Sequence, residues 1–160
     1  MKREVKFRGK DIETNQWLYG NLIKRLGHFP SIMYDYDSQG KVRYAECAVN
    51  RDSIGQYIGI TDKNGVEIYE GDILRSDKYP FSNVEDGVYD NYLVEVCWDE
   101  ECCCFFGYVF KHPNSNVYGI SEGDTVECEN FDSRGLYVIG NIHDNPELIN
   151  KEVESKLPLS

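Results

Sequence analysis

The Asn64-Gly65 pair constrains the fold of this chain more than any other feature. An Asn-Gly pair accepts positive φ angles at little cost and therefore favours a tight hairpin turn. Apolar residues alternate with small or polar ones on both sides of the pair, as expected for two paired strands. A second reversal is expected at residues 70–72, where the Asp72 carboxylate can accept backbone N–H bonds and hold the turn. Residues 55–74 are therefore predicted to form a hairpin, a tight turn and a further strand.

Turn residues recur along most of the rest of the chain, and short alternating runs lie between them. This regular spacing of turn residues between short strands is typical of an all-β protein rather than of alternating βαβ units. Further strands are predicted at residues 5–8, 17–23, 29–36, 42–44, 93–98, 103–110 and 136–142, with a polar reversal at 38–41.

The strand predicted at 93–98 alternates with period two, so Val94, Val96 and Trp98 share one face. We expect that face to be buried and residues 99–101, Asp-Glu-Glu, to form the following turn. Adjacent acids on a turn point in different directions and are usually solvated, so we interpret these three acids and the Glu85-Asp86 pair as structural rather than as a metal or glycosidase site.

Asn, Asp and Ser side chains interrupt the alternation at residues 49–54 and favour local turns. We place a boundary there, between an N-terminal β unit at residues 1–50 and a second β domain at residues 58–155. A short helix at residues 146–154 should close the second domain. Its Asn-Pro-Glu start supplies a cap, a first helical residue and an acid at the positive helix end.

The 160 residues are 41% apolar, which is enough to bury a core. No run approaches the roughly 18 consecutive apolar residues that a membrane span needs. The N-terminal residues are charged and lack the apolar segment of a secretory signal. We therefore expect a cytoplasmic protein with no membrane partner.

The net charge is −11, with 28 acidic and 17 basic residues. Direct nucleic-acid binding is not expected, because binding to the phosphate backbone requires a cationic face. The acidity is explained by solubility alone. A sharper alternative is a surface that meets a basic partner, such as the cationic groove of a nucleic-acid enzyme.

Six cysteines are present, and Cys102, Cys103 and Cys104 are consecutive, which suits disulfide pairing poorly. No Cys-x-x-Cys pair exists, and the three histidines lie far from one another and from any zinc-finger spacing. We expect free thiols in a reducing compartment and no bound metal or cofactor. A metal or redox site at Cys102 to Cys104, with a distant histidine, is the alternative.

Motifs for catalysis are absent from the sequence. It contains no Gly-x-Ser-x-Gly elbow, no phosphate-binding loop, no dinucleotide fingerprint and no His-Glu-x-x-His. A Ser-His-Asp triad assembled in space is not ruled out by sequence. We expect no catalytic residues and a non-enzymatic protein.

The connection at residues 76–92 is long and irregular, and connections of this length are often functional or mobile. It contains the aromatic residues Tyr79, Phe81, Tyr89 and Tyr92. These side chains could bind a partner, since interfaces use aromatic anchors. The alternative is that they close the end of a β-barrel.

The chain also contains a series of blocks in one order along nearly its whole length: residues 5–11 (VKFRGKD), 17–22 (WLYGNL), 53–60 (SIGQYIGI), 62–65 (DKNG), 68–73 (IYEGDI), 138–142 (VIGNI) and 145–148 (NPEL). Together they resemble YopX-type phage and prophage proteins. Residues 76–131 match loosely, and the cysteine cluster departs from the family pattern. The resemblance implies a phage or prophage protein with no assigned activity and no catalytic residues to carry over.

The resemblance further implies that the second domain is similar to a small SH3-like β-barrel and that chains assemble into oligomers. With the residues' own pattern, it predicts a mainly β protein: an N-terminal β unit, an SH3-like barrel and a short C-terminal helix. As function we expect an accessory protein that acts through contacts with an unknown protein partner, as a homo-oligomer. The alternatives are an acidic inhibitor of a host nucleic-acid enzyme and a metal-dependent enzyme.

Overall fold

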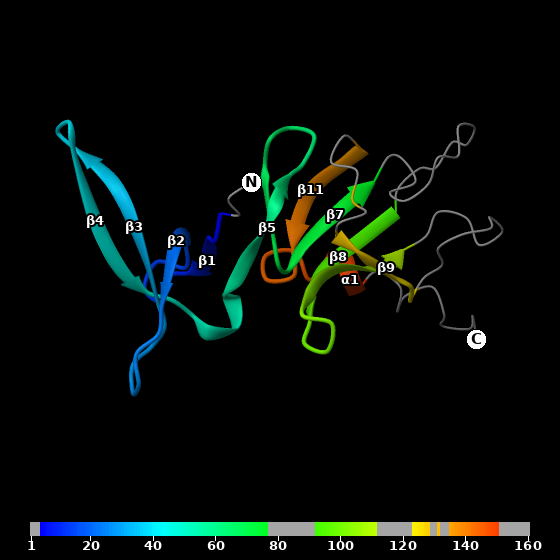
Figure 1. Ribbon diagram of the computed structural model, residues 1–160, viewed down its shortest axis with the longest axis horizontal. Helices are drawn as coiled ribbons and strands as arrows, with labels where there is room; N and C mark the ends of the chain where they lie inside the picture. Colours follow the sequence, from blue (N-terminus) through cyan, green and yellow to red (C-terminus); the bar gives the residue numbers. More distant parts are fainter. Residues whose placement is uncertain (1–3, 77–91, 112–122, 129–130, 132–134, 151–160) are drawn as a thin grey trace, which may run out of the picture. The chain divides into compact units, whose positions relative to one another are not determined.

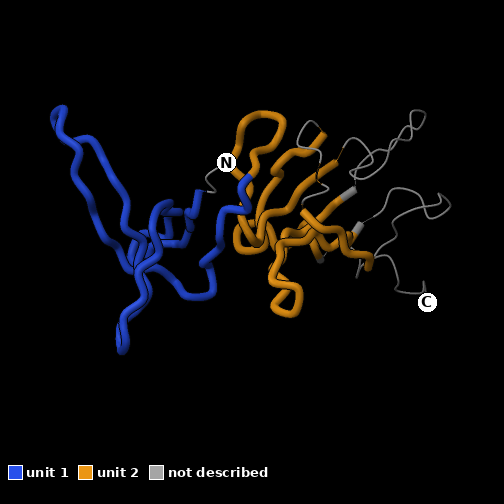
Figure 2. Tube along the Cα trace, viewed as in Figure 1, with its two compact units in different colours: residues 1–59 blue, residues 60–160 orange. Residues whose placement is uncertain are grey.

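The computed structural model describes residues 4–76, 92–111, 123–128, 131 and 135–150. The chain divides into two compact units, residues 1–59 (unit 1) and residues 60–160 (unit 2), as Figure 2 shows. Antiparallel strands make up most of the described residues of both units (Figure 1), which confirms the predicted mainly β class. The segment 49–54, where the sequence predicts a boundary, contains the 3-10 turn η1 (Arg51–Ser53), whereas the division into units lies between residues 59 and 60.

Unit 1 is built on an antiparallel sheet in which β4, β3, β2, β1 and β5 are neighbours in that order. Its strands are β1 (Phe7–Lys10), β2 (Trp17–Ile23), β3 (Ser31–Ser38), β4 (Lys41–Ala48) and β5 (Gly55–Thr61), the last two residues of which belong to unit 2. β1 lies between two partners, because Phe7 is opposite Gly20 of β2 and Gln56 of β5.

The core of unit 1 is small, and its largest buried apolar side chains are Ile32, Val49 and Tyr57. Arg8 is also buried, with its guanidinium carbon 4.6 Å from the centre of the Trp17 ring. Such a cation–π contact lets a charged side chain lie inside a small unit while its stem packs against apolar surface.

Unit 2 contains a five-stranded antiparallel sheet with the order β10-β9-β8-β7-β11. Its elements are β6 (Glu67–Tyr69), β7 (Asp72–Ser76), β8 (Tyr92–Asp99), β9 (Cys104–Lys111), β10 (Thr125–Glu127), β11 (Leu136–Asn141) and α1 (Glu147–Asn150). Within the described residues this sheet is open, with β10 and β11 at its two edges. The SH3-like barrel therefore stays a prediction.

In β8, the predicted burial is confirmed for two of three residues. Val94 and Val96 are almost fully buried, whereas Trp98 is 40% exposed. Trp98 is the last residue before Asp99 and the 99–104 turn, and its ring meets that of Phe105 edge-on, with centroids 4.8 Å apart. The prediction for Trp98 was wrong because alternation gives the face of a side chain but not how far the core extends beneath it.

The predicted hairpin forms between Thr61 and Glu67, and its turn differs in one detail from the expected geometry. Gly65 has a positive φ of 82°, whereas Asn64 is not among the residues with positive φ. The Gly65 N–H donates to the Asp62 carbonyl (3.0 Å), and the Asp62 N–H donates to the Val66 carbonyl (2.7 Å). This is a three-residue loop in which a type I turn is followed by a left-handed glycine.

The Asp62 carboxylate is buried and holds this turn against β11. Oδ1 accepts the backbone N–H of Asn64 (2.8 Å) and of Val66 (2.9 Å), and Oδ2 accepts that of Val138 (3.1 Å). The strand register shifts between Val138 and Gly140, so an irregularity of β11 lies where Asp62 binds it. A single carboxylate thus joins segments 76 positions apart in sequence.

The second predicted reversal is also present. Gly71 has a positive φ of 80°, and the buried Asp72 carboxylate accepts the Tyr69 backbone N–H at 2.8 Å. Hence Asp72 has the structural role expected from the sequence, and it is one of several Asp and Asn side chains that hold turns in this chain.

The predicted C-terminal helix is present as α1 (Glu147–Asn150), and residues 151–154 of the prediction lie outside the described residues. The Asn145 carbonyl accepts the Leu148 N–H at 3.0 Å, as a capping residue does. In the described part of the chain, no helix is long and apolar enough to cross a membrane.

Candidate functional site

Three of the four aromatic residues proposed from the sequence as partner-binding, Tyr79, Phe81 and Tyr89, lie outside the described residues. Tyr92 is the first residue of β8, opposite Ser76, and its side chain is likewise outside the described part. This partner-binding surface therefore stays a prediction. Among the described residues, the candidate contact surface lies in unit 1.

β3 and β4 extend together beyond the rest of the sheet of unit 1 (Figure 1). β2 pairs with β3 only at residues 31–33, whereas β3 and β4 pair along their whole length, from Ser31–Ala48 to Ser38–Lys41. Residues 34–45 therefore form a two-stranded ribbon, which we call the arm. In the described residues, no further strand pairs with either strand of the arm.

A tight turn closes the tip of the arm. Gln39 and Gly40 both have positive φ, 56° and 74°, as a type I′ hairpin turn requires. The Gly40 N–H donates to Asp37 Oδ1 at 2.8 Å. The polar reversal predicted at 38–41 is thus confirmed, and it sets the register of the arm.

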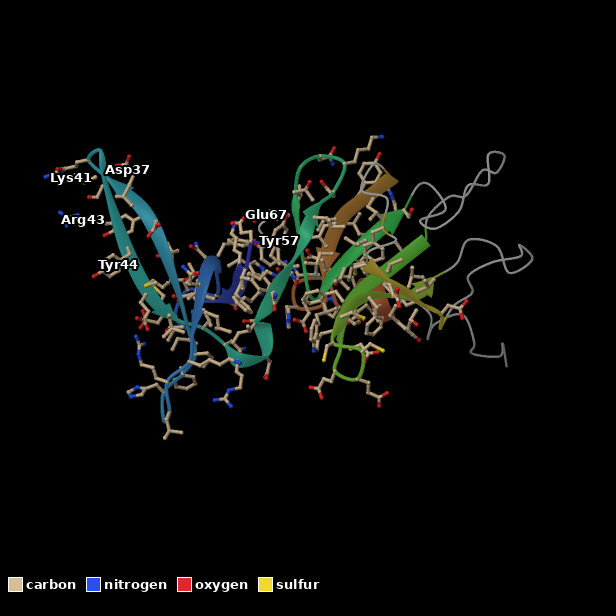
Figure 3. The ribbon with its side chains drawn as sticks, viewed as in Figure 1. Asp37, Lys41, Arg43, Tyr44, Tyr57 and Glu67 are labelled. Carbon is tan, nitrogen blue, oxygen red and sulfur yellow. The ribbon has the colours of Figure 1, made fainter. Side chains whose placement is uncertain are left out.

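The side chains of the arm are exposed on both faces. Val42 is 79% exposed, Tyr44 76% and Tyr36 46%. Figure 3 shows Asp37, Lys41, Arg43 and Tyr44 on the arm. An apolar or aromatic side chain exposed singly is ordinary, but three on one ribbon form a candidate contact surface.

The register divides these side chains between two faces of different charge. Residues directly opposite each other in antiparallel strands share a face. Tyr36 is opposite Arg43, so the face that we call the cationic face carries Tyr36, Lys41 and Arg43. The other, the acidic face, pairs Asp35 with Tyr44 and Asp37 with Val42.

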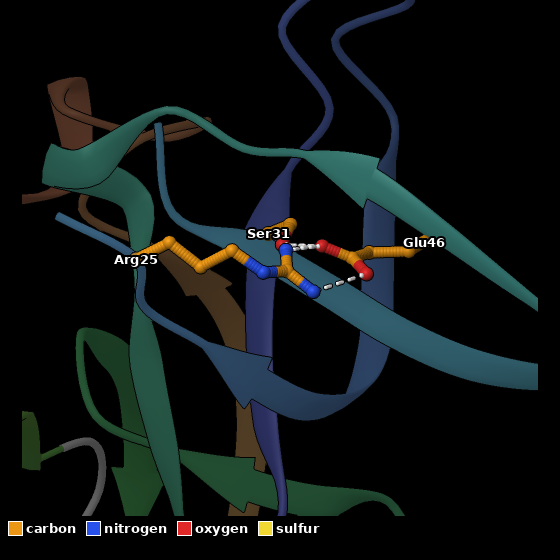
Figure 4. A network of polar contacts seen from close by, with 3 residues as sticks. All are labelled: Arg25, Ser31 and Glu46. Atoms are coloured by element: carbon orange, nitrogen blue, oxygen red, sulfur yellow. Dashed lines mark hydrogen bonds and ion pairs between the residues drawn. The ribbon is translucent and has the colours of Figure 1, made fainter. Parts of the chain in front are cut away.

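A polar network fixes the base of the arm (Figure 4). The Arg25 guanidinium donates hydrogen bonds to the Glu46 carboxylate from both terminal nitrogens, from Nη2 to Oε2 at 3.0 Å and from Nη1 to Oε1. The Ser31 hydroxyl donates to the same Oε1 at 2.5 Å. The Arg25 hydrogen bond, followed by that of Ser31, lowers the pKa of Glu46 from 4.5 to about 2. The network ties the β2–β3 connection to β4.

This network predicts a distinctive acid titration. The pKa of Glu46 is about 2 in the folded protein. The ionised Glu46 carboxylate therefore contributes fully to the stability of the folded state above about pH 4.5, and this contribution is lost as the pH falls toward 2. An NMR titration of the Glu46 carboxyl carbon should show a midpoint near 2. Arg25→Gln should move that midpoint up toward 4.5, and Ser31→Ala should move it less. An unchanged midpoint in Arg25→Gln would contradict the assignment.

The cysteine cluster lies on the turn between β8 and β9. Asp99 Oδ1 accepts the N–H of Glu101 (2.8 Å) and of Cys102 (3.0 Å), and Cys103 has a positive φ of 53°. Cys102 and Cys103 are exposed. Among the described residues, no group of three or more His, Cys, Asp or Glu side chains is placed to hold a metal ion.

The thiols should differ in reactivity by their burial. Burial raises the pKa of Cys97 and of Cys128 to about 12, so each should be about one part in ten thousand thiolate at pH 8. Iodoacetamide at pH 8 should therefore label Cys102 and Cys103 at least about 100-fold faster than Cys97 and Cys128. Peptide mass spectrometry over a time course measures this, and equal rates at all four thiols would refute it.

Sequence reasoning located the strands of the arm but missed the arm as a surface. Tyr and Asp alternate at 34–37, and cationic and apolar residues alternate at 41–44, so each strand by itself has one apolar face. The register places the apolar residues of one strand beside charged residues of the other, so neither face of the ribbon is uniformly apolar. A ribbon with no continuous apolar face has no core to cover it.

Comparison with known proteins agrees with the fold. The chain is similar to the crystal structure of protein EF1440 from Enterococcus faecalis, with a TM-score of 0.52 and 24% sequence identity over 92% of this chain and 99% of that chain. At this identity the likeness concerns the fold alone. No curated protein matches the chain. The family model described as YopX protein matches residues 6–150, as the blocks in the sequence predicted, and the chain therefore belongs to the YopX protein family.

Proposed function

We propose that this chain is a non-enzymatic phage or prophage accessory protein that acts in the cytoplasm through protein–protein contacts, as a homo-oligomer. The arm carries the proposal, because Tyr36, Val42 and Tyr44 are exposed on a ribbon that presents both faces. Aromatic side chains are enriched where interfaces are buried, and large exposed apolar patches often mark interaction sites.

The proposal includes an SH3-like β-barrel in unit 2. Strands β7 to β10 follow one another in the sheet, and the last strand, β11, returns to pair with β7. From this order, a five-stranded barrel requires the strands to tilt and stagger so that the two edge strands approach each other. Nuclear Overhauser contacts between β10 and β11 would support the barrel, and their absence in a fully assigned spectrum would count against it.

The test of the proposed function uses the full chain. Light scattering coupled to size-exclusion chromatography should give the mass of two or more chains of 18.5 kDa. Affinity purification from lysogenic cells should recover a defined partner, compared with an unrelated acidic protein of similar size. A chain that is monomeric at every concentration and recovers no partner would overturn the proposal.

A second candidate function is inhibition of a host nucleic-acid enzyme. Acidic residues are concentrated in unit 2, which contains 21 of the 28, against 7 basic residues, for a formal net charge of −14. Such a unit could occupy a cationic groove. The candidate predicts salt-sensitive inhibition of a host nuclease or polymerase, relieved by excess duplex DNA. No inhibition at low salt across a panel of these enzymes would remove it.

A further inference from the structure

The two faces of the arm carry opposite charge within a single ribbon. The cationic face has Lys41 and Arg43, and the acidic face has Asp35 and Asp37. All four side chains are exposed. Each face also carries an exposed aromatic residue, Tyr36 on the cationic face and Tyr44 on the acidic face. A surface with these features is complementary to the reverse face of another copy of itself.

We propose that the arm is the assembly site of this protein, and that the cationic face of one copy docks on the acidic face of the arm of a second copy. The proposal rests on the proposed function, of which it names the partner and the surface. In this contact Lys41 and Arg43 meet the carboxylates of the second copy. The aromatic and apolar side chains of both faces are buried between the ribbons, at the roughly 10 Å spacing of packed sheets.

The isolated arm needs such a contact on physical grounds. A two-stranded ribbon outside a larger sheet is at best marginally stable in water. The Arg25–Glu46–Ser31 network holds only the base of the arm, and the type I′ turn holds only its tip. Packing Val42 and Tyr44 against a second arm would stabilise the region between them.

Pairing of β4 edges between copies fits the charges less well. An antiparallel pair related by a two-fold axis keeps each face continuous across the edge, so the cationic faces of both copies would lie on one side. Arg43 and Lys41 of one copy would then lie beside those of the other, and like charges directly opposite destabilise a sheet. Lysine on an edge strand is in itself a common device against such pairing.

Nucleic acid also fits the arm less well than a second copy. Residues 34–45 contain two basic and two acidic residues and have no net charge. Binding to the phosphate backbone gains its free energy from an excess of basic groups. The acidic face would repel a duplex, whereas it is half of the contact between copies.

Docking of unlike faces is heterologous, which fixes the kind of assembly. Each copy offers one cationic and one acidic face, so copies join head to tail and close into a ring if the rotation allows. Blocking either face on every copy should therefore abolish assembly. Blocking opposite faces on two different copies should leave one usable contact and produce a dimer.

The experiment measures the mass of the full chain and its arm variants by light scattering and sedimentation velocity. Lys41→Glu with Arg43→Glu blocks the cationic face, and Val42→Ser with Tyr44→Ser blocks the acidic face. Each double variant should be monomeric where the wild type is assembled, with at least about tenfold weaker association. An equimolar mixture of the two should form a 1:1 dimer, and raised salt should weaken assembly of the wild type.

Lys24→Glu with Arg51→Glu is the matched control, because it makes the same change in net charge at exposed residues of unit 1 outside the arm. It should assemble as the wild type does. Circular dichroism checks that each variant is folded. If an arm variant fails to fold, a cross-linking experiment on the wild type replaces it. Zero-length carbodiimide cross-linking of a mixture of 14N-labelled and 15N-labelled wild-type chains should join Lys41 of a chain with one label to Asp35 or Asp37 of a chain with the other label.

The outcomes separate this inference from the proposed function. A wild-type oligomer unchanged by both arm variants, or a mixture of the variants that stays monomeric, overturns docking of unlike faces but leaves the proposed function standing. A wild-type monomer that recovers a different protein overturns docking between copies and the homo-oligomer of the proposed function, but leaves its action through contacts with another protein standing. A wild-type monomer without a partner overturns both.

Discussion

Replacing Gly20 by alanine is expected to lower the free energy of unfolding of unit 1 by about 3 kcal/mol. A Cβ on Gly20 would lie 2.2 Å from the backbone oxygen of Met33 and 3.2 Å from the Tyr34 Cβ. The obstacle is backbone, which cannot rotate away as a flexible side chain can. β3 would therefore have to move from β2 at the base of the arm, where the two strands have only a short pairing.

Gly40→Ala is the control for Gly20→Ala. Its Cβ would enter open space, but its φ of 74° is in the left-handed region, so the cost is about 1 kcal/mol from backbone strain. Urea unfolding followed by Trp17 fluorescence, in a Trp98→Phe background, reports on unit 1. If Gly20→Ala were no less stable than Gly40→Ala, the close approach of β2 and β3 would be refuted.

Replacing Asp62 by alanine is expected to destabilise unit 2 by about 3 kcal/mol. The buried carboxylate accepts backbone N–H groups from Asn64, Val66 and Val138, and the variant would leave these donors without it. Both the hairpin turn and its attachment to β11 would be weakened together. Unfolding followed by Trp98 fluorescence, in a Trp17→Phe background, measures the effect.

Asp62→Asn separates the two roles of the carboxylate. The amide oxygen can still accept the N–H groups of Asn64 and Val66, but the amide nitrogen would face the Val138 N–H, a donor against a donor. The free energy of unfolding of unit 2 in Asp62→Asn should therefore lie between that of the wild type and that of Asp62→Ala. Glu100→Ala, at an exposed acid on another turn, should change stability by less than about 0.5 kcal/mol. Equal effects of Asp62→Asn and Asp62→Ala would show that the Val138 bond dominates.

Local turn chemistry explains most of the agreement between sequence and structure. β2 has its predicted bounds, and the reversals at 38–41, 62–66 and 70–72 are present. A turn depends on the φ preferences and side-chain acceptors of four or five neighbouring residues, all of which can be read from the sequence. Strand limits elsewhere moved by a few residues, because a strand ends where its partner ends and the partner is not local.

The differences concern surfaces. Trp98 shares its alternation with Val94 and Val96, yet the core does not reach it. Tyr44 and Val42 are in a predicted strand, yet nothing in the described residues covers them. Alternation assigns side chains to faces but does not state which face another segment will cover. The candidate site could therefore not be found from the strand pattern alone.

The amino-acid sequence by itself determined two properties of this protein. The short antiparallel strands joined by Asp-, Asn- and Gly-dependent turns follow from the preferences of neighbouring residues, and the family follows from the order of short sequence blocks along the chain. The tertiary structure alone decided that Gly20 must lack a side chain, that Asp62 binds Val138, and that the arm presents two faces of opposite charge. Each of these depends on strand pairings between distant segments, whose register and neighbours are set by the packing of the whole unit.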